Sequence, residues 1–137
     1  MQLATSGLII IKDRRLLLAL SKNKKCFYLP GGKIDNGETN TVALCREIRE
    51  ELSIDLAEDD LIYYAHITAP AFGEAPNVWM EQDCFLVNKP LTPVISSEIE
   101  DIRYFNLKEY QRQQRQAPGA IMILQQLVND NLVDYDD

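Results

Sequence analysis

The sequence lacks any hydrophobic run of the length that crosses a membrane, and it has few residues that form cross-links or bind soft metals. No stretch approaches the roughly 18 consecutive apolar residues of a transmembrane helix. The three cysteines, Cys26, Cys45 and Cys84, are odd in number and widely separated, and no CxxC pair is present. We therefore expect free thiols and no zinc site. The single histidine, His66, is expected to have a structural role.

Basic residues are in the minority. The chain has 14 Lys+Arg against 21 Asp+Glu, which gives a net charge of −7 and a pI near 4.7. This balance argues against binding to a nucleic-acid polymer, which needs a basic face. It does not argue against a small phosphate-containing substrate, because a bound metal ion can neutralise acidic residues locally.

No leader, linker or repeat divides the 137 residues. The opening segment, MQLATSGLIII, lacks the basic region and cleavage site of a secretion signal, so we expect a cytoplasmic protein that does not associate with membranes. No low-complexity tract is present, and the length suits one domain over residues 1–137.

Apolar and β-branched runs alternate with polar turns through most of the chain. They predict strands at residues 3–11, 15–21, 26–30, 61–67, 77–87 and 101–107. The polar turn at 12–15 predicts that the first two strands form a hairpin. Loops are expected at 21–25, 68–76 and 89–97, the first of them basic and the second of a kind that covers substrates in many enzymes.

Helices are expected at residues 40–52, 108–116 and 118–131. In the last helix, Ile121, Leu124 and Val128 are expected to line the packed side. In the first, Thr39 is a candidate N-cap.

The helix at 40–52 carries three carboxylates on one side. At roughly 100° per residue, Glu47, Glu50 and Glu51 fall within an arc of about 100°. Leu44 and Ile48 lie on a neighbouring side that can pack against a core. Like charges at these spacings repel, so the face is either exposed to water or compensated by cations. In the second case the cation would be a hard divalent metal ion, because such ions prefer oxygen ligands.

The region from Gly32 to Ile54 resembles the signature of the Nudix hydrolases, in which glycine, glutamate and an Arg-Glu-aliphatic-X-Glu-Glu segment recur at fixed spacing. The matching positions are Gly32, Glu38, Arg46, Glu47, Ile48, Glu50, Glu51 and Ile54. The chain departs once, with Ser53 where the family has glycine. Ser53 can adopt the left-handed conformation of a helix end at a cost of about 1 kcal/mol, or the helix can run slightly further.

The resemblance implies a Nudix-type α/β/α sandwich, with a mixed central sheet flanked by helices. It also implies hydrolysis of a phosphoanhydride in a nucleoside diphosphate linked to another group, with Mg²⁺, or Mn²⁺, as the cofactor. Glu50 and Glu51 match metal ligands, and the carbonyl of Gly31 matches another. Glu47 matches a position that is a ligand in some members and a candidate general base in others. Arg46 and Glu38 match supporting positions. Arg46 can hold in place a glutamate of the Nudix box, which is the segment from Gly32 to Ile54.

A further acid completes the family's site from a loop that precedes an aromatic pair. Tyr104-Phe105 resembles that pair. Glu98 is the favoured acid, as both a catalytic residue and a metal ligand, with Glu100 as the alternative.

Candidates for substrate binding are Phe27, Tyr28, Lys33 and Trp79, with Tyr104 as a further aromatic near the expected cleft. Nucleotide bases stack on such rings, although aromatic residues also fill cores. Glu81 and Asp83 share a strand face; packing or solvent exposure is expected there, with a metal or base-reading role as the alternative.

The function that we expect is that of a MutT-like nucleoside triphosphate pyrophosphohydrolase, acting as a monomer or a homodimer. Hydrolysis of ADP-ribose or ADP-sugars is the alternative, and Pro70 lies near the spacing that the family associates with ADP-ribose hydrolysis. A non-catalytic nucleotide-binding regulatory domain is a third hypothesis. Glu50 and Glu51 are both present, which favours an enzyme.

Overall fold

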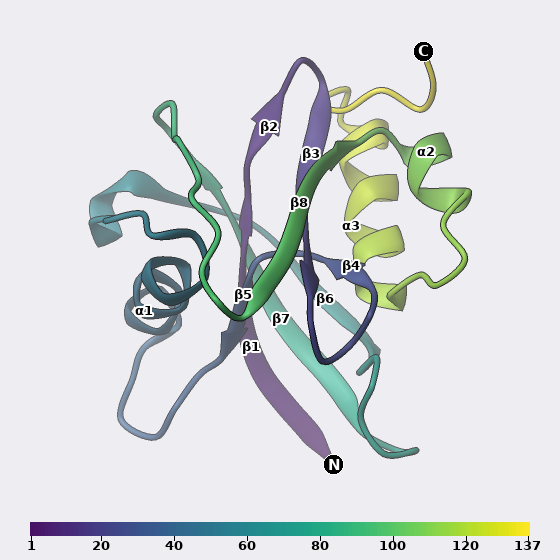
Figure 1. Cartoon of the computed structure of the whole chain (residues 1–137). Helices are drawn as coiled ribbons and strands as arrows, with labels where there is room; N and C mark the ends of the chain where they lie inside the picture. Colours follow the sequence, from purple (N-terminus) through teal and green to yellow (C-terminus); the bar gives the residue numbers. More distant parts are fainter.

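Two four-stranded β-sheets lie between helix α1 on one side and helices α2 and α3 on the other (Figure 1). The computed structural model describes all 137 residues. The first sheet has the order β5–β1–β7–β6; β1 and β7 are parallel, and the two outer pairs are antiparallel. In the second sheet β3 pairs with β2, β4 and β8, antiparallel in each case. This arrangement confirms the expected α/β/α sandwich with a mixed central sheet.

The strands are β1 (Gln2–Ile9), β2 (Ile11–Lys12), β3 (Arg15–Ser21), β4 (Phe27–Tyr28), β5 (Gly31–Lys33), β6 (Leu61–Pro70), β7 (Trp79–Val87) and β8 (Ile99–Phe105). The helices are α1 (Asn40–Leu52), α2 (Leu107–Gln111) and α3 (Pro118–Asn129), with a short 3₁₀ turn at Glu58–Asp60.

The predicted hairpin between residues 3–11 and 15–21 is largely wrong. The chain changes sheets after Ile9: β1 pairs with β5 and β7, and only the two residues of β2 pair with β3. The tight turn itself is present, with left-handed φ angles of 52° at Asp13 and 61° at Arg14. Two successive left-handed residues match the twist of a hairpin, which here is very short.

Several further boundaries differ from those expected. The strands expected at 26–30, 77–87 and 101–107 are Phe27–Tyr28, Trp79–Val87 and Ile99–Phe105. Strand β6 continues to Pro70, which pairs with Trp79, so the loop begins at residue 71 and not at 68. Helix α2 ends at Gln111, five residues before the predicted end. Helix α3 begins at Pro118 and ends at Asn129.

The buried side of α3 is turned by about one residue from the predicted one. Ile123, Leu124 and Leu127 are fully buried, whereas Ile121 and Val128 are only partly buried at the edge of the core. Both sets have helical spacing, and the packing of α3 against β6 and α2 decides which of them faces inward.

Helix α1 has the bounds that the sequence predicts. The Val42 N–H donates to Thr39 Oγ1 at 3.3 Å, which caps the N-terminus. Ser53 takes the left-handed conformation (φ 57°) and its N–H donates to the Arg49 carbonyl at 3.1 Å. Leu44 and Ile48 are fully buried in the core cluster between α1 and the sheets. This packing fixes the rotation of the helix and therefore the direction of its carboxylates.

The three cysteines are free thiols, as predicted; Cys26 and Cys84 are buried and Cys45 is half-buried. None of the helices combines the length and the apolar character that a membrane crossing requires.

Candidate active site

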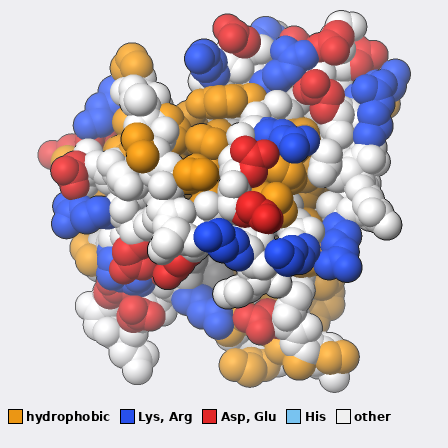
Figure 2. Space-filling model, in the orientation of Figure 1, with side chains coloured by type: hydrophobic (Ala, Val, Ile, Leu, Met, Phe, Trp, Pro, Cys, Tyr) orange, Lys and Arg blue, Asp and Glu red, His pale blue; other side chains and the backbone are white.

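A cavity of about 550 Å³ opens between α1, strands β1, β4 and β5, and four connecting segments. The face in Figure 2 is hollowed, with acidic and basic side chains gathered around the hollow. The predicted site residues that line the cavity are Tyr28, Gly31, Lys33, Arg46, Glu47, Glu51 and Glu98. The remaining lining residues are Leu3, Thr5, Asn23, Lys24, Gly32, Asp35, Ala71, Phe72 and Glu74. The structure therefore brings most of the predicted site into one place.

Glu51 is a buried carboxylate at the end of the cavity beside α1. Its residue is only 5% exposed, because it lies at the border between the acidic and the apolar sides of the helix. The Gly31 N–H donates to Oε1 at 2.8 Å and the Tyr28 hydroxyl donates to Oε2 at 3.2 Å. Burial, helped by the charges of Glu47 and Glu98 and opposed by the two hydrogen bonds, raises the pKa of Glu51 to about 8.

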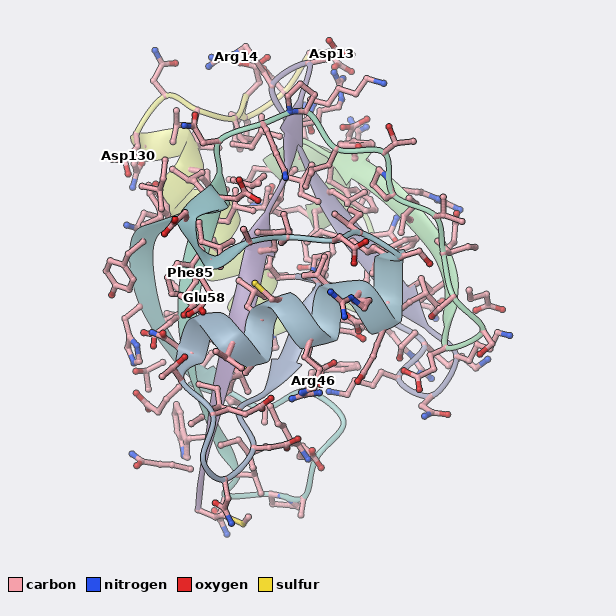
Figure 3. The ribbon with its side chains drawn as sticks, turned by 90° about the vertical axis from the view of Figure 1, so that its left-hand side faces the viewer. Asp13, Arg14, Arg46, Glu58, Phe85 and Asp130 are labelled. Atoms are coloured by element: carbon pink, nitrogen blue, oxygen red, sulfur yellow. The ribbon has the colours of Figure 1, made fainter.

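Arg46 links the box carboxylates to one another. Its Nε and Nη2 donate to the two carboxylate oxygens of Glu38 at 2.8 and 2.9 Å, and its Nη1 donates to Glu47 Oε1 at 2.8 Å. In Figure 3 the Arg46 side chain leaves α1 towards the connection from β5, where Nη2 also donates to the Lys33 carbonyl at 3.1 Å. The guanidinium lowers the pKa of Glu38 to about 2. Arg46 therefore contacts Glu38, Glu47 and the Lys33 carbonyl at once, and its role in supporting a metal site stays a prediction.

Burial raises the pKa of Glu47 in spite of the contact with Arg46. Glu47 therefore resembles Glu51 in being an acidic group that is partly removed from water and close to like charges. Glu50 differs, since its side chain is 51% exposed and lies 3.6 Å from Arg46, and it is not among the residues that line the cavity.

The two glycines of β5 permit this close packing. Gly31 has a φ of 141°, and a Cβ there would lie 2.0 Å from the Ser6 carbonyl oxygen. A Cβ on Gly32 would lie 2.5 Å from the carboxylate carbon of Glu47. Any side chain at either position would displace the backbone or the carboxylate.

The acidic residues fit a hard divalent cation by donor type. All of the candidate ligands are oxygen donors, as Mg²⁺ and Mn²⁺ prefer. Burial, more than the neighbouring acidic charges, raises the pKa values of Glu47 and Glu51, and a bound cation would favour their ionised forms. In this structure Glu47 faces Arg46 and Glu51 faces Gly31, and no three acidic, histidine or cysteine side chains converge on one point. The carboxylates would have to rotate towards a common centre to hold a cation.

The structure separates the two candidates for the distal acid. Glu98 lines the cavity and its charge raises the pKa of both Glu47 and Glu51. The Ser96 N–H donates to the Glu51 carbonyl at 3.0 Å, which ties this loop to the end of α1. Glu100 does not line the cavity. The geometry favours Glu98, and its role as a ligand stays a prediction.

Three of the aromatic residues expected near the cleft lie elsewhere, and one of them, Tyr104, lines a separate cavity. Phe27 is 4% exposed and packs edge-on against Phe105 in the core, with ring centroids 5.1 Å apart. Trp79 is exposed at the start of β7, outside the cavity. Tyr28 and Lys33 do line it. Sequence reasoning missed Phe72, an aromatic residue within a loop that had been recognised only as a possible cover.

His66 forms a polar cluster on the sheet with the two acids of β7. Its Nδ1 lies 2.8 Å from Asp83 Oδ1 and its Nε2 lies 2.8 Å from Glu81 Oε1. These contacts, Asp83 first, raise the pKa of His66. The Asn40 side chain also donates to Asp83 at 3.1 Å, which connects the cluster to the start of α1. None of these residues lines the cavity, and the structural role of His66 stays a prediction.

Comparison with known proteins places the chain in a family. The family model described as NUDIX domain matches residues 1–127, so the chain belongs to the NUDIX domain family of hydrolases, as the box residues indicated. The crystal structure of a MutT NUDIX hydrolase from Burkholderia pseudomallei has a TM-score of 0.76 and 25% identity, and the match covers 93% of this chain and 98% of that one.

Two further similarities concern proteins named for ADP-ribose. An ADP-ribose pyrophosphatase of Methanocaldococcus jannaschii is 49% identical over 49 residues, which are 34% of this chain and only 29% of that protein. A bifunctional NMN adenylyltransferase/ADP ribose pyrophosphatase from Francisella tularensis, solved with AMP and a Mn ion, has a TM-score of 0.67 at 20% identity. The match covers 95% of this chain and 42% of that one, and it shows the fold alone.

Proposed function

We propose that the protein is a divalent-metal-dependent pyrophosphohydrolase of MutT-like type, which cleaves a phosphoanhydride bond in a nucleoside triphosphate. The observation that carries the proposal is the position of Glu51, buried beside Glu47 and Glu98 at one cavity. Family membership and the full-length likeness to a MutT NUDIX hydrolase support it. The cavity volume of about 550 Å³ is in the range of small-molecule sites.

The acidic residues would hold the cation. Glu50 and Glu51 are its proposed ligands, with Glu47, the Gly31 carbonyl and Glu98 completing the set. When bound, Mg²⁺ or Mn²⁺ neutralises charge on the phosphates and acidifies the attacking water.

Glu47 is the candidate general base. A carboxylate whose pKa burial raises is a better proton acceptor than an exposed one, so Glu47 is suited to take a proton from the attacking water. Arg46 orients it through the 2.8 Å contact with Oε1. Tyr28 and the Gly31 N–H orient Glu51 in the same way.

Two lysines are placed to bind the phosphates. Lys33 lines the cavity with a 61% exposed side chain, and its one ion pair is a 3.4 Å contact with Glu74. Lys24 lines the cavity and has no carboxylate partner. A polyphosphate could therefore contact both ammonium groups without displacing a close ion pair.

ADP-ribose or ADP-sugar hydrolysis is the second candidate. The local 49% identity to an ADP-ribose pyrophosphatase favours it, as does Pro70, although that proline is exposed at the end of β6 and does not line the cavity. We also propose that residues 1–137 form a single domain, that the protein is cytoplasmic, and that it is active as a monomer or a homodimer.

A hydrolysis screen with Mg²⁺ and with Mn²⁺ tests these candidates. The substrates are canonical and oxidised nucleoside triphosphates, ADP-ribose, ADP-sugars and dinucleoside polyphosphates, with identification of the products. Pyrophosphate and a nucleoside monophosphate from one triphosphate would support the first candidate. AMP and ribose phosphate from ADP-ribose would support the second. Binding of a nucleotide without cleavage under either metal would instead indicate the non-catalytic regulatory domain.

A further inference from the structure

The geometry points to Phe72 as the side chain on which the aromatic base of the substrate stacks. On this view the connection between β6 and β7 selects nucleotides over inorganic polyphosphates, whereas the box carboxylates act on the phosphates. The inference rests on the proposed function, since it takes the same cavity as the substrate site.

Phe72 is presented at the corner of a tight turn. The Glu74 N–H donates to the Ala71 carbonyl at 3.3 Å, and Gly73 has a φ of +81°. A left-handed residue at the third position is the mark of a type II turn, which places Phe72 at the second. The Ala71 N–H donates to the Val78 carbonyl at 3.0 Å and closes the connection at its base.

Two lysines of the cavity lie beside this turn. Lys33 Nζ lies 3.4 Å from Glu74 Oε1, and a Cβ on Gly73 would lie 3.5 Å from Lys24 Cγ. Figure 1 shows the β6–β7 connection on the same lower side of the molecule as the β3–β4 connection that carries Lys24. The turn therefore lies beside the two lysines that are proposed to bind phosphates.

The lining of the cavity differs in chemistry between its parts. Leu3, Ala71 and Phe72 provide apolar surface, whereas Glu47 and Glu51 provide charge. A nucleotide has the same division, with an apolar aromatic base and a charged polyphosphate. Apolar walls with a few placed polar groups are typical of sites that bind such ligands.

Phe72 is the aromatic ring of the cavity that is free to receive a base. The only other one, Tyr28, has its hydroxyl bonded to Glu51, and Lys24 Nζ lies 5.4 Å from the centroid of its ring. Phe72 is partly buried against the core on one side and lines the cavity on the other. A half-buried ring is held rigidly while it offers a face to a ligand.

The test compares Phe72→Ala, Phe72→Leu and Phe72→Tyr with the wild-type protein. The measured quantities are KM and kcat for the nucleotide found in the screen, and the inhibition constant of inorganic triphosphate against it. Loss of a stacking contact is expected to raise KM about fivefold or more in the Ala and Leu variants, with kcat and the inhibition constant of triphosphate within twofold of wild type. Phe72→Tyr should retain the wild-type KM. Trp79→Ala, which removes an exposed aromatic outside the cavity, is the matched control.

An unchanged KM in both Phe72→Ala and Phe72→Leu would overturn the inference. So would an equal loss for nucleotide and triphosphate, because that result indicates damage to the loop rather than loss of a base contact. If the wild-type protein cleaves nothing, the proposed function fails by itself. Titration of nucleotide and triphosphate binding to the same variants then decides the role of Phe72 independently.

Discussion

Replacing Glu51 by glutamine should stabilise the metal-free protein at alkaline pH while removing its activity. The folded-state pKa of Glu51 is raised from 4.5 to about 8, with burial as the largest cause. Below pH 4.5 the side chain is protonated in both the folded and the unfolded chain, so the burial of its carboxyl group does not make the free energy of unfolding depend on pH. As the pH rises towards 8 the unfolded chain releases its proton first, and the free energy of unfolding falls.

The size of the effect follows from the same values. Each pH unit between the two pKa values corresponds to about 1.4 kcal/mol, so the total cost above pH 8 is about 3–5 kcal/mol. Glutamine has the same shape and cannot ionise. Its amide oxygen can accept from the Gly31 N–H as Oε1 of Glu51 does at 2.8 Å, so the variant avoids the cost.

The assay is urea denaturation in the presence of a chelator, at pH 5 and at pH 8.5. The difference in the free energy of unfolding between Glu51→Gln and wild type should be small at pH 5 and about 3–5 kcal/mol in favour of the variant at pH 8.5. With Mg²⁺ present, kcat of the variant should fall about 100-fold or more. Glu100→Gln, at an acid outside the cavity, should change neither quantity.

A variant that is no more stable than wild type at pH 8.5 would refute the reasoning from burial. A variant with near wild-type turnover at saturating Mg²⁺ would remove Glu51 from the chemistry, whatever its effect on stability.

Three other predictions concern residues around the site. Arg46→Ala should lower kcat/KM about 10- to 100-fold in steady-state assays, because the box carboxylates lose their orienting partner; Arg49→Ala, whose ion pair is exposed, is the control, and equal activities of the two variants would contradict this role. The raised pKa of His66 means that its contacts stabilise the protein fully below the unfolded pKa near 6.5, and that this stabilisation is lost as the pH rises through the higher folded pKa. Since the side chain is 42% exposed, the effect should be small. Urea denaturation should show that the free energy of unfolding of wild type, relative to that of His66→Gln, falls by less than about 1 kcal/mol between pH 6 and pH 9. A rise over this interval would contradict the reasoning. Ser53→Gly should raise the free energy of unfolding by about 1 kcal/mol, because glycine takes the left-handed φ of 57° without strain; a lower Tm by calorimetry would show that the serine is favoured there.

Helix α1, and with it the side that carries its carboxylates, could be predicted because the signals are local. The N-cap at Thr39, the apolar spacing of Leu44 and Ile48, and the acidic spacing all lie within a few turns of chain. The one departure, Ser53, did not move the helix end, because the left-handed conformation that a glycine would take is available to serine at modest cost.

The strand pairing of the N-terminal segment could not be predicted in this way. Residues 3–11 carry one continuous strand signal, but the partners of β1 lie at residues 31–33 and 79–87. The change of sheet after Ile9 depends on those distant strands, and only the turn at Asp13 and Arg14 is local.

The position of Phe72 depends on contacts between distant segments as well. Its turn lies beside Lys33 and Lys24, which are about 40 to 50 residues earlier in the chain. The sequence indicated a loop of a kind that covers substrates, but it contained no signal that Phe72 would be the residue of that loop to line the cavity. Phe27 shows the converse, since its place next to the box in sequence did not put its buried ring in the site.

The most direct test of the central claim is a ³¹P NMR time course of nucleoside triphosphate incubated with the chelated protein, followed by addition of Mg²⁺. The account predicts no turnover under chelation, and the appearance of nucleoside monophosphate and pyrophosphate after Mg²⁺ is restored. Cleavage at an unchanged rate under chelation would contradict a metal-dependent role for the carboxylates of α1. Binding of the nucleotide without cleavage, with Mg²⁺ or Mn²⁺ in excess, would contradict the assignment as a pyrophosphohydrolase.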